Sequence, residues 1–461
     1  MSDRGSLWRH GDFMKLWSAE TVSQLGSQVS LLAIPLIAIS VLKATTLQVG
    51  LLSAVEMAPF LLVGLPAGAI VDRLRRRPVL IAGDVGRALA LGSIPIAHAF
   101  NVLGLAQLYV VAFVTGVLTV FFDVAYQAYL PALVERDQLV DGNGKLEISR
   151  SGAQVAGPGI AGVLIDALGP AAAVTADAAS FVASALGIGA IRRPEPAPAK
   201  ADGERLRTQI GEGLRYVLRH RLLRSIAGST ATSNLFSAMM QAVLLLYLVR
   251  TLHFRPGLIG LVFVIGNVGV LAGAFGSGTI ARRIGLGPAI VGSIGLCGLA
   301  PLLIPLAPQD SRGTAIAFLV VAQAVTGAGS VVYNVNQVSL RQAICPARLQ
   351  GRMNATMRFM VWGTLPLGAV IGGVLARALG LRPTLWIAAI GGMAAVLWVL
   401  LSPVRSLVDI PPEEESLGEE LAHASPGIGG VVGPVGGPAG VVHEPVVGLG
   451  VEGDGDVVEG A

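Results

Sequence analysis

The feature that most limits what this chain can fold into is a succession of apolar runs, each long enough to cross a membrane. A helix needs roughly 20 apolar residues to span the hydrocarbon core of a bilayer. Hydrophobic residues make up 53% of the sequence and charged residues only 13%, more apolar surface than a soluble core can bury. We therefore predict an all-α membrane protein with twelve transmembrane helices, over residues 16–41, 47–71, 79–99, 105–130, 148–169, 171–191, 223–249, 257–281, 286–307, 313–335, 358–379 and 382–402.

The positions of lysine and arginine indicate how the spans are oriented, because cytoplasmic loops near span ends carry most of the cations. With both termini in the cytoplasm, 26 of the 33 cations fall in cytoplasmic segments and 6 fall outside, which leaves Arg87 within a span. The first apolar run is too long for a signal peptide and should remain as an anchor. Arginine greatly outnumbers lysine, which favours a bacterium. We expect a multi-pass protein of the bacterial inner membrane with both termini cytoplasmic.

A polar stretch divides the predicted spans into two sets of six. We expect a cytoplasmic N-terminus over 1–15, a six-helix bundle over 16–191, a cytoplasmic linker with a basic amphipathic helix over 192–222, and a second bundle over 223–402. The basic patch that ends the linker fits either an anionic membrane surface or a solvated helix. Residues 403–461 are rich in proline, glycine and valine, which is typical of a disordered tail.

A short motif occurs once in each set of six spans, about 210 residues apart. The copies are Gly68-Ala-Ile-Val-Asp72-Arg73 and Gly278-Thr-Ile-Ala-Arg282-Arg283, each at a cationic turn between two apolar runs. The repetition indicates an internal duplication. Many secondary transporters are built from such repeats, with the substrate path between them. We therefore expect two pseudo-symmetric six-helix bundles.

Polar side chains recur every three or four residues along four spans, so each set shares one helix face. Such a stripe is costly against lipid and should face the bundle interior or a water-filled cavity, although any one member can simply hydrogen-bond to a neighbouring helix. Because the four spans occupy matching repeat positions, we favour a cavity. Its predicted lining, with Arg358 added from the eleventh span, comprises Gln24, Gln28, Thr119, Gln127, Asn234, Gln241, Asn334, Gln337 and Arg358.

Carboxylates within the predicted spans are candidates for proton coupling. Each is costly at mid-membrane, and a carboxyl shielded from water can take up and release a proton near neutral pH. By span direction two lie toward the cytoplasmic side and two toward the outer side. Two alternatives stay open, an interfacial Glu20 and an Asp177 that only caps or bonds a neighbouring helix. The four candidates are Glu20, Asp123, Glu56 and Asp177.

Glycine and proline cluster in the fifth and eleventh spans. The fifth contains Gly157, Pro158 and Gly162, and the eleventh contains Pro366 and Gly368. Proline removes a helix hydrogen bond, and glycine lets two helices approach closely. We expect the residues of the fifth span to form a packing motif that lets the bundles rock.

The turn after the second span resembles the Gly-x-x-x-Asp-Arg-x-x-Arg-Arg signature of the major facilitator superfamily. Residues 12–402 resemble that family's twelve-helix plan, and segments 13–17, 122–131, 212–216 and 366–368 resemble its enterobactin-exporter and macrolide-efflux branch, the transmembrane secretion effectors. The resemblance implies the major facilitator fold and proton-driven antiport, with export of a hydrophobic drug or siderophore-like molecule by alternating access. It also implies an antiporter motif at Gly157 and Pro158, and a cytoplasmic gate formed by Gly68, Asp72, Arg73 and Arg76.

Three departures from the family pattern affect the coupling chemistry and the gate. Ala161 stands where the antiporter motif usually has glycine, and the fourth span lacks the arginine that many proton antiporters of the family carry. Arg282 occupies the second-half position that corresponds to Asp72. The two gates therefore cannot work identically.

Other classes of protein are less compatible with the sequence. No phosphate-binding loop is present, and Cys297 and Cys345 indicate neither a disulfide framework nor a metal cluster. We expect a monomer that is not an enzyme, has no cofactor and binds no nucleic acid. Its expected partners are an amphiphilic small molecule, protons and the lipid bilayer. The alternatives that stay open are an importer or ion-independent facilitator, and a non-transporting membrane sensor.

Overall fold

The computed structural model describes residues 7–71, 73–135, 138–193, 195 and 206–409, and this part of the chain is built from helices and turns without a β-strand. The predictions for Asp72, for residues 1–6 and 196–205, and for the tail from residue 410 onward fall outside it. Ten helical segments in the described part are long and apolar enough to cross a membrane. They coincide with ten of the twelve predicted spans. The other two predicted spans are occupied by a pair of shorter helices and by a long helix with a polar first half.

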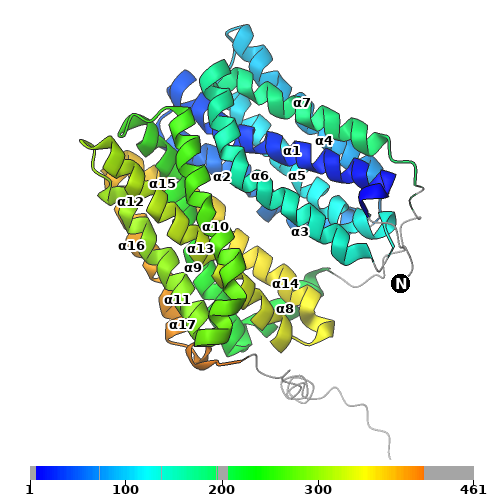
Figure 1. Ribbon diagram of the computed structural model, residues 1–461, viewed down its shortest axis with the longest axis vertical. Helices are drawn as coiled ribbons and strands as arrows, with labels where there is room; N and C mark the ends of the chain where they lie inside the picture. Colours follow the sequence, from blue (N-terminus) through cyan, green and yellow to red (C-terminus); the bar gives the residue numbers. More distant parts are fainter. Residues whose placement is uncertain (1–6, 72, 136–137, 194, 196–205, 410–461) are drawn as a thin grey trace, which may run out of the picture. The chain divides into compact units, whose positions relative to one another are not determined.

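The first group of helices, called here the N-terminal half, contains six of the predicted spans (Figure 1). The second predicted span is interrupted at Val63, where α2 gives way to α3. The helix of the fifth span begins nine residues before its apolar run, because the run records only the part inside the membrane. The elements are η1 (Leu7–Arg9), α1 (Gly11–Leu36) continued by a π-helical turn, η2 (Ile37–Val41), α2 (Thr46–Leu62), α3 (Gly64–Val71), α4 (Arg76–Ala99), α5 (Leu105–Leu133), α6 (Leu139–Leu168) and α7 (Pro170–Gly189).

The remaining helices form what is called here the C-terminal half. A short amphipathic helix, α8, precedes the first span of this half and packs against α14. The eleventh predicted span is bent at Gly363, between α14 and α15. The elements are α8 (Leu206–Arg219), α9 (Arg221–Arg250), α10 (Pro256–Ile284), α11 (Leu286–Leu299), η4 (Ala300–Leu302), α12 (Leu303–Leu306), α13 (Arg312–Ile344), α14 (Ala347–Trp362), α15 (Thr364–Leu379), α16 (Leu381–Met393), α17 (Ala395–Leu400) and η5 (Pro403–Ser406).

Single glycines make the tightest connections between spans. Gly169, Gly285 and Gly380 have φ angles of 80°, 90° and 96°, a region that glycine enters without a Cβ penalty. Gly169 joins the fifth and sixth predicted spans, and Gly380 joins the eleventh and twelfth. The same one-residue turn at equivalent positions supports the internal repeat.

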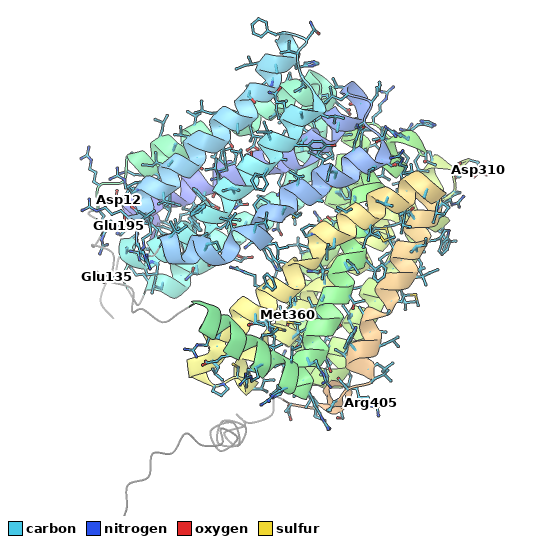
Figure 2. All side chains as sticks on the ribbon, turned by 180° about the vertical axis from the view of Figure 1, so that it is seen from behind. Asp12, Glu135, Glu195, Asp310, Met360 and Arg405 are labelled. Atoms are coloured by element: carbon cyan, nitrogen blue, oxygen red, sulfur yellow. The ribbon has the colours of Figure 1, made fainter. Side chains whose placement is uncertain are left out.

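The two ends of the molecule differ in charge. One end, called here the Arg-rich face, carries Arg73, Arg75–Arg77, Arg192, Arg193, Arg282, Arg283, Arg352 and Arg405. The other end, called here the distal face, consists of the turns at residues 42–45, 100–104, 169, 251–255, 307–311 and 380. Figure 2 shows Asp310 and Arg405 at opposite ends of the C-terminal half, and Asp12, Glu135 and Glu195 together at one end of the N-terminal half.

The buried apolar residues form several cores, and these differ in whether one half or both halves contribute to them. The largest core draws on both halves, from Val29 and Leu108 to Tyr247 and Leu319. Toward the Arg-rich face, a second core contains only residues 7–191 and a third contains only residues 216–404. The halves therefore share one core near the distal face and have separate cores near the Arg-rich face.

Candidate functional site

Glycines bring the two halves into backbone contact near the distal face. A Cβ at Gly162 of α6 would lie 2.7 Å from the Pro256 oxygen and 3.0 Å from the Gly257 Cα, both of α10. A Cβ at Gly50 of α2 would lie 2.7 Å from the Gly373 Cα of α15. Under the internal repeat, α6 of the fifth span corresponds to α15 of the eleventh, and α2 of the second span corresponds to α10 of the eighth. Each pair therefore maps onto the other, and the closure is pseudo-symmetric.

The predicted packing motif of the fifth span lies along this closure. The Pro158 carbonyl would meet a Cβ at Gly260 of α10, so the fifth span contacts the opposite half there. Gly157 faces its own half instead, where the side chain of Gln28 packs directly on it. The structure thus uses Pro158 and Gly162 for contact between halves and Gly157 for contact with α1.

Polar contacts reinforce the closure at its distal edge. Asp166 accepts a hydrogen bond of 2.9 Å from the Gly257 amide, at the start of α10, where an acceptor satisfies an otherwise unpaired helix N–H. The Arg250 guanidinium donates to the Ala44 carbonyl of the other half. Sequence reasoning missed Asp166 because its partner lies 91 positions away in the chain.

Contacts at mid-depth mark where the closure ends. The rings of Phe60 and Trp362 lie 5.2 Å apart, and the Asn267 amide donates a 2.7 Å hydrogen bond to the Gln154 carbonyl. Beyond this level the two halves have separate cores. The contact between the halves is therefore concentrated near the distal face, and toward the Arg-rich face each half packs on its own core.

A cavity of about 780 Å³ opens in the C-terminal half, and is called here the C-terminal cavity. Four of its lining residues, Asn234, Asn334, Gln337 and Arg358, were predicted from the polar stripes. The full lining is Thr230, Ser233, Asn234, Ile294, Cys297, Ser330, Tyr333, Asn334, Gln337, Arg341, Asn354, Met357, Arg358, Val361 and Trp362.

Side chains in the C-terminal cavity bond mainly to one another. Gln337 Nε2 donates to Asn334 Oδ1 at 2.9 Å, and the hydroxyls of Thr230 and Tyr333 are 2.7 Å apart. Asn234 Nδ2 donates to the Val361 carbonyl at 3.2 Å. The buried Gln337 Oε1 and Arg341 Nε have no partner among the described atoms. A bound polar molecule could occupy these positions.

Arg341 was missed by sequence reasoning although a signal was present. It lies four residues after Gln337 and so continues the same polar stripe. The apolar run of the tenth span ends near residue 335, but α13 continues to Ile344. Arg341 lies beyond the apolar run, so its place on the same helix as Gln337 became clear only from the structure.

A group of charged residues, called here the Arg87 cluster, lies in the N-terminal half. The Arg87 guanidinium is 2.5 Å from Asp84 Oδ1, and its Cζ lies 4.3 Å and 4.1 Å from the ring centres of Phe122 and Phe181. Both members of the ion pair are buried. A guanidinium held between two aromatic faces gains a cation–π attraction. The cluster comprises Glu20, Asp84, Arg87, Asp123 and Asp177.

Two of the predicted proton-coupling residues lie where the Arg87 cluster meets the space between the halves. Glu20 is buried, its Oε1 accepts a 2.6 Å hydrogen bond from Gln24, and its Oε2 has no described partner. Asp123 is exposed and lies within electrostatic reach of Arg87, Arg150 and Arg358. Because Arg358 belongs to the opposite half, Asp123 faces the space between the halves rather than lipid.

The other two predicted carboxylates lie in different surroundings. Asp177 is only 1% exposed and accepts a 3.2 Å hydrogen bond from Ser180, where α7 packs on Gly26 of α1. The bond lies within α7, so it does not by itself link Asp177 to a neighbouring helix. Glu56 on α2 is partly buried, and no charged group of the described chain acts on it.

The remaining predicted lining residues are not part of the C-terminal cavity. Gln24 bonds to Glu20, Gln28 packs on Gly157, and the Gln241 amide donates to the Ser237 hydroxyl at 3.2 Å. Thr119 is partly buried and Gln127 is exposed, both on the helix face of Asp123.

Among the predicted gate residues, Arg76 is bonded to Glu195 at the start of the linker. Glu195 accepts hydrogen bonds of 2.6 Å and 3.1 Å from the amides of Arg76 and Arg77, and its carboxylate lies 3.7 Å from the Arg76 guanidinium. It thereby caps α4, a role that no local sequence signal revealed. Arg73 is exposed, and among the described residues no atom lies within 4 Å of a Cβ at Gly68.

Long apolar helices, two halves related by a repeat and a polar cavity in the C-terminal half define a multi-pass membrane transporter of the major facilitator fold. Residues 6–437 match the family described as transmembrane secretion effector, and the chain belongs to that family.

Comparison with individual proteins agrees with this assignment. The multidrug efflux pump Tap of Mycolicibacterium fortuitum is 26% identical over 385 residues, which are 82% of this chain and 92% of Tap. Macrolide efflux protein A of Streptococcus pyogenes is 20% identical and covers 80% of this chain and 90% of its own length. Among solved structures, a bacterial homologue of the iron transporter ferroportin in an inward-facing state aligns with a TM-score of 0.68 at 16% identity, covering 86% of this chain and 99% of that one.

Proposed function

We propose that this protein exports a hydrophobic drug or siderophore-like small molecule by alternating access, with proton entry as the driving force. The observation that carries the proposal is the difference between the two ends of the interface. Glycine-mediated contact joins the halves near the distal face, while beyond it Asp123 lies within electrostatic reach of Arg358 of the opposite half. The names of the relatives Tap and macrolide efflux protein A support export as the direction and antibiotics as the class of cargo.

We place the Arg-rich face in the cytoplasm, since cytoplasmic loops carry the excess of arginine and lysine. The space between the halves then opens to the cytoplasm, where an exporter takes up its cargo. In this arrangement both termini are cytoplasmic. The transporter consists of two bundles, residues 16–191 and 223–402, joined by the linker 192–222. It works as a monomer in the bacterial inner membrane. The tail 403–461 is proposed to be cytoplasmic.

Glu20 and Asp123 are the proposed proton carriers. Both lie near the fixed positive charge of Arg87, and Asp123 is exposed while Glu20 is buried beside it. In the outward-open state the cytoplasmic side is closed, and these carboxylates lose contact with water. Because a charged carboxylate without water is costly, this state favours the protonated form. Glu56 and Asp177 remain secondary candidates, because no charged group of the described chain acts on Glu56, and Asp177 is 1% exposed and bonded by Ser180 of its own helix.

The proposed gate lies at the Arg-rich face. In the outward-open state the halves would meet there, and Asp72, Arg73 and Arg76 next to Gly68 would bond across the gap. Close contact at Gly68 would then form, since the space beside it is open in the present state.

Charge-neutralising substitutions test the coupling. In proteoliposomes with an imposed pH gradient, we expect Glu20→Gln and Asp123→Asn to reduce drug efflux roughly tenfold or more, since proton transfer by a positioned group commonly contributes at least that factor in rate. Substrate binding without a gradient should persist. The control is Asp310→Asn, which removes an exposed carboxylate from a distal turn.

Several outcomes would argue against proton coupling. Efflux that is independent of the pH gradient in the unmodified protein would favour a facilitator or an importer. Unchanged gradient-driven efflux in all of Glu20→Gln, Glu56→Gln, Asp123→Asn and Asp177→Asn would exclude the carboxylates as carriers. Ligand binding with no transport across a broad panel of compounds would favour a sensor.

A further inference from the structure

The C-terminal cavity carries a positive charge that its own residues do not balance. Two arginines, Arg341 of α13 and Arg358 of α14, line it, and no aspartate or glutamate is among its described lining residues. Buried or partly buried charges in proteins are normally paired, because an unpaired one is costly. Two unbalanced guanidinium groups in one cavity therefore indicate an anionic ligand.

The local contacts of both arginines leave donors available. Arg341 is partly buried, and its Nε has no partner among the described atoms. Arg358 is exposed and lies over the Trp362 ring, with its Cζ 5.5 Å from the ring centre. A guanidinium that lies over an aromatic ring can still donate hydrogen bonds from the N–H groups along its edge to an anion.

Nearby carboxylates do not neutralise this pair of arginines. Glu212 is committed to an ion pair with Arg352. Asp123 acts on Arg358 from across the space between the halves, but the ion pairs of the described chain do not include that contact. The positive charge of the two arginines therefore stays unbalanced within the C-terminal cavity, and Asp123 lies across from it on the N-terminal half.

We propose that the C-terminal cavity binds an acidic amphiphile, with the substrate carboxylate held by Arg341 and Arg358. This inference rests on the proposed export function and specifies the class of its cargo. Asn234, Asn334 and the unpartnered Gln337 Oε1 bond the polar part of the molecule, and Met357, Val361 and Trp362 contact its apolar part. A volume of about 780 Å³ accommodates a drug-sized compound.

The charges on the two halves also fix the orientation of such a substrate. Its carboxylate is repelled by Asp123 and attracted by the two arginines, so the anionic end points into the C-terminal half. A neutral ester of the same compound keeps the apolar contacts but loses the charge-assisted hydrogen bonds, which are about twice as strong as neutral ones. Acid and ester should therefore differ in affinity at this site.

The experiment compares 1-pyrenebutyrate with its methyl ester as ligands of the purified full-length protein in lipid nanodiscs. Apparent affinity is taken from the rise in unfolding temperature across a ligand titration. We expect the acid to bind roughly tenfold more tightly than the ester, as the loss of one charge-assisted hydrogen bond would produce. Arg341→Gln and Arg358→Gln should each weaken the acid about tenfold and leave the ester unchanged.

The matched control is Arg282→Gln, which removes the same charge from the same half at an exposed position bonded only to Thr279 among the described residues. It should not change the affinity for either compound. If Arg341→Gln does not fold, Arg341→Lys should fold and keep the preference for the acid. Equal binding of acid and ester, no binding of the acid, or equal weakening of both compounds by the arginine variants would overturn the inference.

Transport measurements separate this inference from the proposed function. Export of neutral drugs by a protein that shows no preference for the acid would leave the export function intact and reject the acidic cargo. Arginine-dependent binding of the acid by a protein that exports nothing would support the site and reject the export function.

Discussion

At the scale of single residues, the Arg87 cluster shows how a membrane protein keeps charges inside. Arg87 has a direct carboxylate partner in Asp84 and two aromatic faces in Phe122 and Phe181, yet Arg87 Nε and Asp84 Oδ2 remain without described partners. The sequence revealed Arg87 as a cation within a predicted span. It could not reveal the partners, because the two rings come from different helices, α5 and α7.

The ion pair predicts a compensation between two substitutions. Breaking a buried pair by removing one partner leaves an unpaired charge and costs about 3–5 kcal/mol, so we expect Arg87→Met to lower the free energy of unfolding by that order. Adding Asp84→Asn should restore most of the loss. Denaturant titration in mixed micelles measures both, with the exposed Arg405→Met as control. An Arg87→Met variant with an unchanged free energy of unfolding, or a double variant less stable than the single one, would contradict this account.

At the scale of helices, apolar length predicted most of the elements and glycine predicted where two of them touch. Ten predicted spans coincide with membrane-length apolar helices, since the bilayer imposes the length. The polar start of α6 and the extension of α13 to Ile344 were not predicted, because a helix that continues beyond the bilayer has no apolar run to mark it. Gly162 was expected to pack, but its partner α10 became known only from the structure.

The contact at Gly162 predicts the effect of a single methyl group. In Gly162→Ala the new Cβ would lie 2.7 Å from the Pro256 oxygen, so the backbone must shift. Overpacking of this kind costs about 1–3 kcal/mol, and roughly every 1.4 kcal/mol changes an equilibrium tenfold. We expect weaker distal closure and a several-fold lower initial rate of efflux, measured in vesicles at equal protein.

The control for this prediction is Gly92→Ala on α4, where no atom of the described chain lies within 4 Å of the added Cβ. Its efflux rate should equal that of the unmodified protein. Equal rates in both variants would show that the α6–α10 contact does not limit the transport cycle.

At the scale of the whole molecule, the arrangement of the apolar cores defines one state of a cycle. A shared core near the distal face and separate cores near the Arg-rich face mean that the halves can pivot without breaking either separate core. The repeat in the sequence predicted two related halves, as Gly169 and Gly380 in equivalent turns illustrate. The sequence could not predict which end of the interface between the halves is closed, because the two motifs that begin at Gly68 and Gly278 are compatible with either state.

The native cysteines allow this state to be tested without adding a probe site. Cys297 lines the C-terminal cavity, and Cys345 is 1% exposed and can be replaced by alanine. An impermeant maleimide should label Cys297 at least roughly tenfold faster in inside-out than in right-side-out vesicles, because the minor state of a two-state protein is commonly populated at about 10% or less. The background control is Cys297→Ser. Adding Gly162→Ala should raise labelling in right-side-out vesicles, since it weakens closure at the distal face. Equal labelling from both sides would mean that the distal contacts do not seal the cavity, and faster labelling from outside would reverse the orientation assigned to the Arg-rich face.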